Sequence, residues 1–143
     1  MNNQTLYMSI DYGSKKIGVA IGQLVTKKAS PLKIIYKKKE DAWSELDNII
    51  KEWKPSVIII GYPFTKKLNN FMKDLDIFIE EIIKKYKNSI EIIKFSERLS
   101  TEESKYVYSQ IRQSKYNIKR KDDLDDISAC LILQSWFNEN MIN

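Results

Sequence analysis

Three acidic residues stand next to predicted strands or helices and could do chemistry. Asp11 ends an apolar, β-like run, Glu97 follows a second such run, and Asp125 opens the apolar run of the last predicted helix. Carboxylates that converge from separate elements repel one another unless a cation lies between them. With one or two Mg²⁺ or Mn²⁺ ions, such a trio can direct water to a phosphodiester bond. We therefore take all three as candidate catalytic residues and metal ligands.

Each of these residues also has a plain structural interpretation. Asp11 precedes Gly13 and could simply cap a hairpin turn. Asp125 lies in an acidic cluster at a predicted helix N-terminus, where the helix dipole favours negative charge. Glu97 could form a surface ion pair with its neighbour Arg98. Singly, these readings are as good as the functional one, but three such coincidences at consistent positions favour a site.

The chain contains no histidine and a single cysteine, Cys130. Serine–histidine and cysteine–histidine nucleophile pairs are therefore excluded within this chain, as is a zinc site built on histidine or on a cysteine cluster. Any metal must be a hard cation held by oxygen ligands, such as Mg²⁺ or Mn²⁺.

Basic residues outnumber acidic ones, 24 to 19, which gives a formal charge of +5 and favours a polyanionic partner. Tyr106, Tyr108 and Tyr116 could stack on unpaired bases. The alternative is a solvated charged surface with partly buried tyrosines, which we prefer for the lysines at 37–39 and 84–85. The candidate nucleic-acid-binding residues are Lys15, Lys16, Arg98, Arg112, Lys115, Lys119, Arg120 and Lys121.

Hydrophobic periodicity predicts an α/β fold that would bring the acidic residues together. The order βββαβαβα plus a C-terminal helix implies a mixed five-stranded sheet with helices on both faces. Small residues at Ser128 and Ala129 would let the last helix approach the sheet and present Asp125 toward Asp11. Strands are predicted at 6–11, 16–22, 31–37, 57–61 and 90–95, and helices at 41–53, 70–86, from Ser100 onward, and 124–138.

The length of 143 residues and the absence of any linker-like segment predict a single domain spanning 1–143. No apolar run approaches the roughly 20 residues of a membrane span, and the N-terminus lacks a signal-peptide pattern. With one cysteine there is no disulfide framework. We expect a cytoplasmic protein that has no membrane partner.

Four motifs together resemble the YqgF/RuvX family, whose members are described as pre-16S rRNA nucleases or Holliday junction resolvases with an RNase H-like fold. The resemblance extends from about Tyr7 to Phe137. The motifs are Asp11-Tyr12-Gly13-Ser14-Lys15-Lys16-Ile17-Gly18-Val19-Ala20, Gly61-Tyr62-Pro63, Glu97-Arg98-Leu99-Ser100-Thr101, and the helix from Leu124-Asp125 to Gln134.

The resemblance implies metal-binding catalytic roles for Asp11, Glu97 and Asp125, with Mg²⁺ or Mn²⁺ as cofactor. It also implies structured RNA as substrate, namely the 5′ end of pre-16S rRNA in ribosome biogenesis. The chain departs from the family pattern in two places. Ser96 replaces the usual first Asp of the Asp-Glu-Arg segment, and the segment 64–68 after Pro63 lacks the family's glycine-containing turn.

Three alternative functions remain open at this stage. A Holliday junction resolvase would use the same chemistry on branched DNA and should be a dimer, whereas the sequence predicts only a monomer or weak homodimer. A sugar-kinase or chaperone-type ATPase needs two lobes around its nucleotide, and 143 residues supply one. A catalytically silent RNA-binding or ribosome-assembly module draws some support from Ser96.

Overall fold

The structure is a computed structural model that describes residues 5–38, 40–63, 69–96, 102, 105, 106, 109 and 127–140. Its centre is one five-stranded sheet in the order β3-β2-β1-β4-β5. β1 pairs with β2 and β2 with β3 in antiparallel fashion, whereas β1–β4 and β4–β5 are parallel. The predicted mixed sheet is thus confirmed. Its strands are β1 (Leu6–Tyr12), β2 (Lys16–Gln23), β3 (Lys28–Tyr36), β4 (Val57–Gly61) and β5 (Glu91–Phe95).

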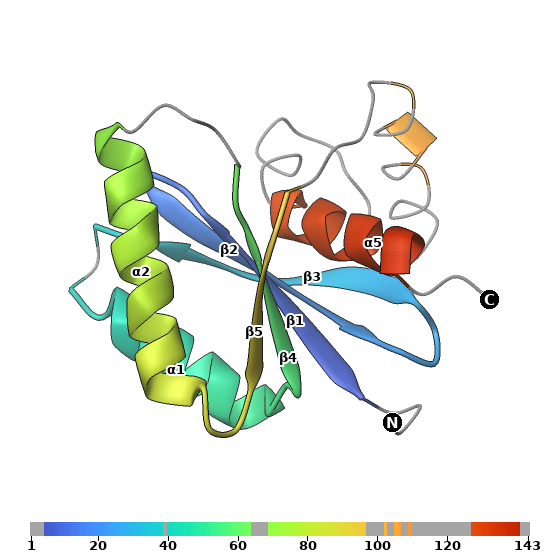
Figure 1. The fold of residues 1–143 in the computed structure, drawn as a ribbon, viewed down its shortest axis with the longest axis horizontal. Coiled ribbons are helices and arrows are strands. Elements are labelled where there is room, and N and C mark those ends of the chain that lie inside the picture. The colour runs from blue at the N-terminus through green and yellow to red at the C-terminus, as the bar shows by residue number, and fades with distance from the viewer. Residues whose placement is uncertain are drawn as a thin grey trace.

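Helices cover both faces of this sheet, as expected (Figure 1). α1 (Ala42–Trp53) and α2 (Asn70–Tyr86) pack on one face, and α5 (Ser128–Asn140) packs on the other. No helix in the described part of the chain is long and apolar enough to cross a membrane.

The alternation of side chains along β1 divides the core into two layers. Successive residues of a strand point to opposite faces. Met8 and Ile10 accordingly belong to the cluster beneath α1 and α2, whereas Tyr7 packs against α5. Ser9 also points toward α5, because its hydroxyl reaches a carbonyl of that helix. This alternation makes Asp11 face α5 and Tyr12 face the other layer.

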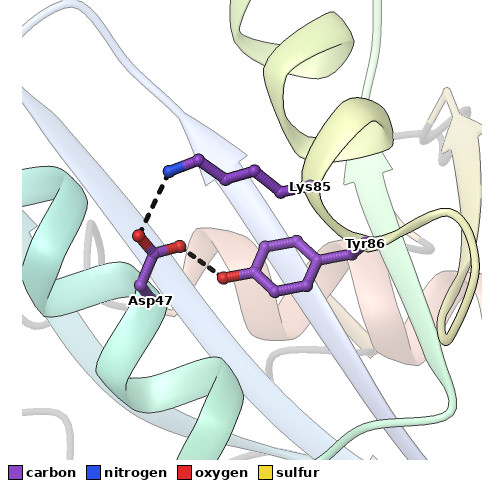
Figure 2. Close-up of polar contacts among 3 residues, drawn as sticks. All are labelled: Asp47, Lys85 and Tyr86. Atoms are coloured by element: carbon purple, nitrogen blue, oxygen red, sulfur yellow. Dashed lines mark hydrogen bonds and ion pairs between the residues drawn. The ribbon is translucent and has the colours of Figure 1, made fainter.

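α1 and α2 are joined by a small polar network (Figure 2). Asp47 of α1 accepts hydrogen bonds from the Tyr86 hydroxyl and from Lys85 Nζ, the latter at 3.1 Å. Burial, then the hydrogen bond to Asp47 and its charge, raise the pKa of Tyr86 far above its usual value of 10.0. The hydroxyl therefore stays protonated and donates to Asp47.

β3 begins at Lys28, three residues earlier than the start predicted at Pro31, and ends at Tyr36 instead of residue 37. Proline is tolerated there because β3 is an edge strand and a bulge lies opposite Val19 and Ala20. The early residues are held by Gln134 of α5, whose side chain accepts from Ala29 N at 3.0 Å and donates to Lys27 O at 2.9 Å. A contact across 105 residues carries no local signal in the sequence.

The remaining elements differ from prediction mainly at their ends. β1 and β2 each extend one residue further than predicted, and β5 begins one residue later. α5 ends at Asn140, two residues beyond the predicted end, while its predicted start at 124–126 lies outside the described residues. Of the helix predicted from Ser100, four residues are described, and all four are helical: Glu102, Lys105, Tyr106 and Ser109.

Candidate active site

Asp11 lies at the C-terminal end of β1 and faces the first turn of α5. Its partner across the antiparallel ladder is Gly18 of β2. A Cβ atom placed on Gly18 would lie 3.6 Å from Cβ of Ala129 and 3.8 Å from Cβ of Asp11. The first turn of α5 therefore rests on the sheet beside the carboxylate.

One buried hydrogen bond fixes this approach. Ser9 Oγ donates to the Ala129 carbonyl oxygen over 2.6 Å, and both residues are fully buried. Ile127, just ahead of the helix, accepts from Leu131 N at 2.8 Å and so closes the first turn. The expectation that small residues at the start of this helix allow close packing is confirmed for Ala129, whereas Ser128 is half-buried and lines the cavity beside this contact.

The Asp11 hollow is a surface cavity of about 280 Å³ next to this contact. It combines one carboxylate, two serine hydroxyls and two ammonium groups. Such a set suits a phosphate, because cations bind its oxygens while the carboxylate and hydroxyls can hold a hard cation. The hollow is lined by Asp11, Gly13, Ser14, Lys15, Lys16, Gly18, Ile34 and Ser128.

The turn between β1 and β2 brings Lys15 and Lys16 into the hollow. Gly13 N donates to Lys16 O at 2.9 Å, and a Cβ on Gly13 would lie only 2.8 Å from that oxygen. Glycine is therefore required by the tightness of the turn. The structure thus brings together three of the predicted site residues: Asp11, Lys15 and Lys16.

Lys37 supports the same turn, although no local pattern distinguishes it from its lysine neighbours. Its Nζ donates to the Tyr12 hydroxyl at 2.8 Å and to Gly13 O at 3.0 Å, and it lies 4.0 Å from the centre of the Tyr12 ring. Its backbone N donates to Lys15 O at 2.9 Å. Lys37 is therefore half-buried and bound within the chain, where a solvated surface lysine was expected, because the turn packs against the end of β3.

The other predicted site residues lie outside the described part of the chain. They are Glu97, Arg98, Arg112, Lys115, Lys119, Arg120, Lys121 and Asp125. Within the described ranges there is no group of three or more acidic or cysteine residues placed to hold a metal. In the sequence, Glu97 comes two residues after the end of β5. β1, β4 and β5 are parallel, so the carboxyl ends of these strands meet at one edge of the sheet.

The donor chemistry of the Asp11 hollow fits Mg²⁺ or Mn²⁺. Its potential ligands are oxygen atoms, from the Asp11 carboxylate and from the hydroxyls of Ser14 and Ser128. Cys130 of α5 is fully buried, and burial raises the pKa of its thiol to about 12. Cys130 is thus a neutral core residue and neither a nucleophile nor a metal ligand.

The amino-acid sequence is similar to those of known proteins. A family model described as "RuvX: Holliday junction resolvase" matches residues 5–139. A protein of Francisella tularensis subsp. novicida, named "Putative pre-16S rRNA nuclease", is 35% identical over 141 residues, covering 93% of this chain and 96% of the relative. A protein of the same name from Francisella philomiragia is 34% identical with the same coverage.

Solved structures of resolvases share the fold. RuvC of T. thermophilus in complex with a Holliday junction substrate aligns with a TM-score of 0.64 at 10% identity, covering 95% of this chain and 96% of that one. The Fowlpox virus resolvase with Holliday junction DNA aligns with a TM-score of 0.55 at 17% identity, covering 96% and 95%. The expected RNase H-like fold is confirmed.

Proposed function

The chain belongs to the RuvX family, and from that premise we propose that it is a metal-dependent nuclease that processes the 5′ end of pre-16S rRNA. The observation that carries the proposal is the Asp11 hollow. There a carboxylate and two ammonium groups share one cavity at the sheet edge where three parallel strands end. The relatives' names supply the substrate.

Lys15 and Lys16 would bind the non-bridging oxygens of the scissile phosphate through their ammonium groups. Asp11 would orient the attacking water and anchor the cation, held rigidly by its place at the end of a buried strand. When bound, Mg²⁺ or Mn²⁺ supplies positive charge against the phosphate and lowers the pKa of water. The water oxygen would form the new bond to phosphorus and release one proton to solvent, while the bond to the leaving oxygen would break and that oxygen would take up one proton from solvent.

Glu97 and Asp125 complete the ligand set in this proposal, with Arg98 as a phosphate contact. Chain connectivity supports the assignment. Glu97 follows the end of β5 by two residues and Asp125 precedes Ser128 by three. Three residues span at most about 11 Å, and Ser128 itself lines the Asp11 hollow. The basic residues between 112 and 121 would then bind the RNA backbone beside the site.

We propose that the protein works in the cytoplasm as a monomer or weak homodimer. The buried, protonated Cys130 thiol is compatible with a reducing compartment. A resolvase acting on branched DNA is the second candidate, favoured by the description of the matching family. It would need two active sites on opposed strands and hence a stable dimer.

The deciding experiment incubates the purified protein and Mn²⁺ with pre-16S rRNA 5′ fragments and, separately, with four-way DNA junctions. Asp11→Asn should abolish cleavage, whereas Asp74→Asn, an exposed carboxylate on α2, should leave it unchanged. Cleavage of RNA alone supports the proposal. Cleavage of junctions alone by a protein that sediments as a dimer would replace it with the resolvase. Tight RNA binding without cleavage would show a non-catalytic assembly module.

A further inference from the structure

A second and larger cavity, the aromatic pocket, opens on the opposite face of the sheet. Its volume is about 410 Å³, within the range of pockets that take small ligands or single side chains. It lies between the end of β1, the first turn of α1 and the middle of α2. The pocket is lined by Tyr12, Ile17, Lys37, Glu40, Ala42, Trp43, Leu46, Asp74, Ile77, Phe78 and Glu81.

The floor of the aromatic pocket is made of stacked rings. Tyr12 and Phe78 stack with their centroids 4.5 Å apart, and Trp43 lies 5.3 Å from Phe78. Two of the apolar lining residues remain accessible: Ile77 is 59% exposed and Trp43 37%. Phe71, in the first turn of α2, is 36% exposed, and its ring centroid lies 6.3 Å from that of Tyr12. Phe78 itself is buried, so Trp43 and Ile77 supply the accessible apolar surface that can take the aliphatic part of an incoming side chain.

The rim of the pocket is acidic, although the chain as a whole carries a charge of +5. Glu40, Asp74 and Glu81 line it with exposed side chains, and within the described residues none of the three forms an ion pair. The one cation in the lining, Lys37, is already bound to Tyr12 and Gly13. Lys85 contacts the Trp43 ring at 4.4 Å, but it is paired with Asp47. The pocket therefore carries a local excess of negative charge.

We propose that the aromatic pocket binds an arginine-containing basic segment of a partner protein. The aliphatic stem of arginine would lie along the exposed part of Trp43, and its planar guanidinium would reach the carboxylates at the rim, which it can bind in bidentate fashion. An adjacent aliphatic residue of the segment would cover Ile77. This site is separate from the nuclease proposal, because it uses neither Asp11 nor the Asp11 hollow.

The charge of the rim argues for a protein and against nucleic acid as the occupant. Stacked rings suit bases as well as guanidinium groups, but the phosphates attached to each base would meet three carboxylates. The Asp11 hollow, by contrast, presents Lys15 and Lys16. We therefore expect the Asp11 hollow, on the α5 face, to bind polyanions. We expect the aromatic pocket, on the α1–α2 face, to bind polycations.

The test follows the indole N–H resonance of Trp43 by NMR, identified with a Trp43→Phe variant, during titration with a capped peptide of four Arg-Leu-Gly repeats. Saturable shifts at Trp43 are expected. Glu81→Lys should weaken binding at least about fivefold, since an attraction becomes a repulsion. Glu80→Lys makes the same charge change one residue away, outside the pocket lining, and should weaken it far less.

Three further results would overturn the proposal. The first is an unmoved Trp43 resonance at millimolar peptide. The second is equal weakening by Glu80→Lys and Glu81→Lys, which would show only long-range attraction. The third is binding at Trp43 of oligouridylate, or of spermidine as tightly as of the peptide, which would assign the pocket to nucleic acid or to a small polyamine. Nuclease activity should be unchanged in Glu81→Lys, so this test and that of the proposed nuclease fail independently.

Discussion

On one face of the sheet, Gly18 leaves room only for a Cβ atom between Ala129 and Asp11, whereas on the opposite face Tyr12, Trp43 and Phe78 pack as large rings. Small residues let α5 approach until a cavity of only about 280 Å³ remains beside the carboxylate. Large rings keep α1 and α2 further out and leave about 410 Å³. The candidate active site at Asp11 therefore lies beside closely packed small residues. The loosely packed aromatic face leaves a pocket that can accept a side chain.

The largest expected effect is a difference in cleavage rate between substitutions of two adjacent residues of β1. Asp11→Asn should lower the rate of cleavage about a thousandfold, roughly 4 kcal/mol of transition-state stabilisation, because the carboxylate holds the cation and the water. Tyr12→Phe should change the rate by less than about threefold, since that side chain faces the other layer. Single-turnover cleavage with Mn²⁺ measures both. Similar losses in the two variants would contradict a site confined to the α5 face.

The next effect tests how closely α5 approaches the sheet. A Cβ on Gly22 would lie 2.7 Å from the Lys28 carbonyl oxygen and 2.8 Å from the Phe137 ring. On Gly61 it would meet chiefly the mobile tip of Ile132, at 2.6 Å. Gly22→Ala should therefore cost about 2–3 kcal/mol of unfolding free energy, and Gly61→Ala less than about 1 kcal/mol. Urea denaturation measures the unfolding free energy of both variants. If Gly61→Ala cost more than Gly22→Ala, the tightest contact between α5 and the sheet would not be at Gly22.

A smaller effect concerns the turn between β1 and β2. Lys37→Met removes the ammonium that donates to Tyr12 and to Gly13 O, so the turn carrying Lys15 and Lys16 loosens. We expect about a tenfold fall in kcat/KM, or about 1.4 kcal/mol. Lys38→Met removes the same charge from the next, exposed residue and should have little effect. If the two variants behave alike, net charge and not the turn is responsible.

The smallest effect concerns the network between α1 and α2 (Figure 2). Tyr86→Phe removes one donor to Asp47, which keeps its bond from Lys85, and should cost about 1 kcal/mol at pH 7. Because the pKa of Tyr86 is raised from 10.0 in the folded protein, the stability it contributes is complete below about pH 10 and is lost as the pH rises further. Burial, and to a lesser extent Glu91, raise the pKa of Tyr7 in the same sense.

Chemical denaturation between pH 8 and 12 tests this expectation. The wild-type protein should lose stability more steeply above pH 10 than Tyr86→Phe does. Tyr36→Phe, which alters an exposed tyrosine (53%), serves as the matched control and should follow the wild type. Parallel curves for all three proteins would show that the alkaline loss arises at other groups.

Much of the fold could be predicted from local patterns. The two-residue period of β1, the apolar run of β4 and the amphipathic spacing of α1 and α2 each reflect burial of a face that the sequence itself marks. The early start of β3 could not be predicted, because Gln134 holds Lys27 and Ala29 from the far end of the chain. Nor could the role of Lys37, which has the same local surroundings as Lys38.

By itself, the sequence excluded histidine-based nucleophile pairs and zinc sites built on histidine or on a cysteine cluster, and so directed attention to the carboxylates as candidates. It also determined that Asp11 and Tyr12 face opposite layers, because alternation along a strand is a local property of the backbone. Only the tertiary structure decided that Lys15 and Lys16 line one cavity with Asp11, that Ala129 packs against β1 and β2, and that an acidic aromatic pocket lies on the other face. These depend on distances between residues remote in the chain, which the packing of the helices on the sheet sets.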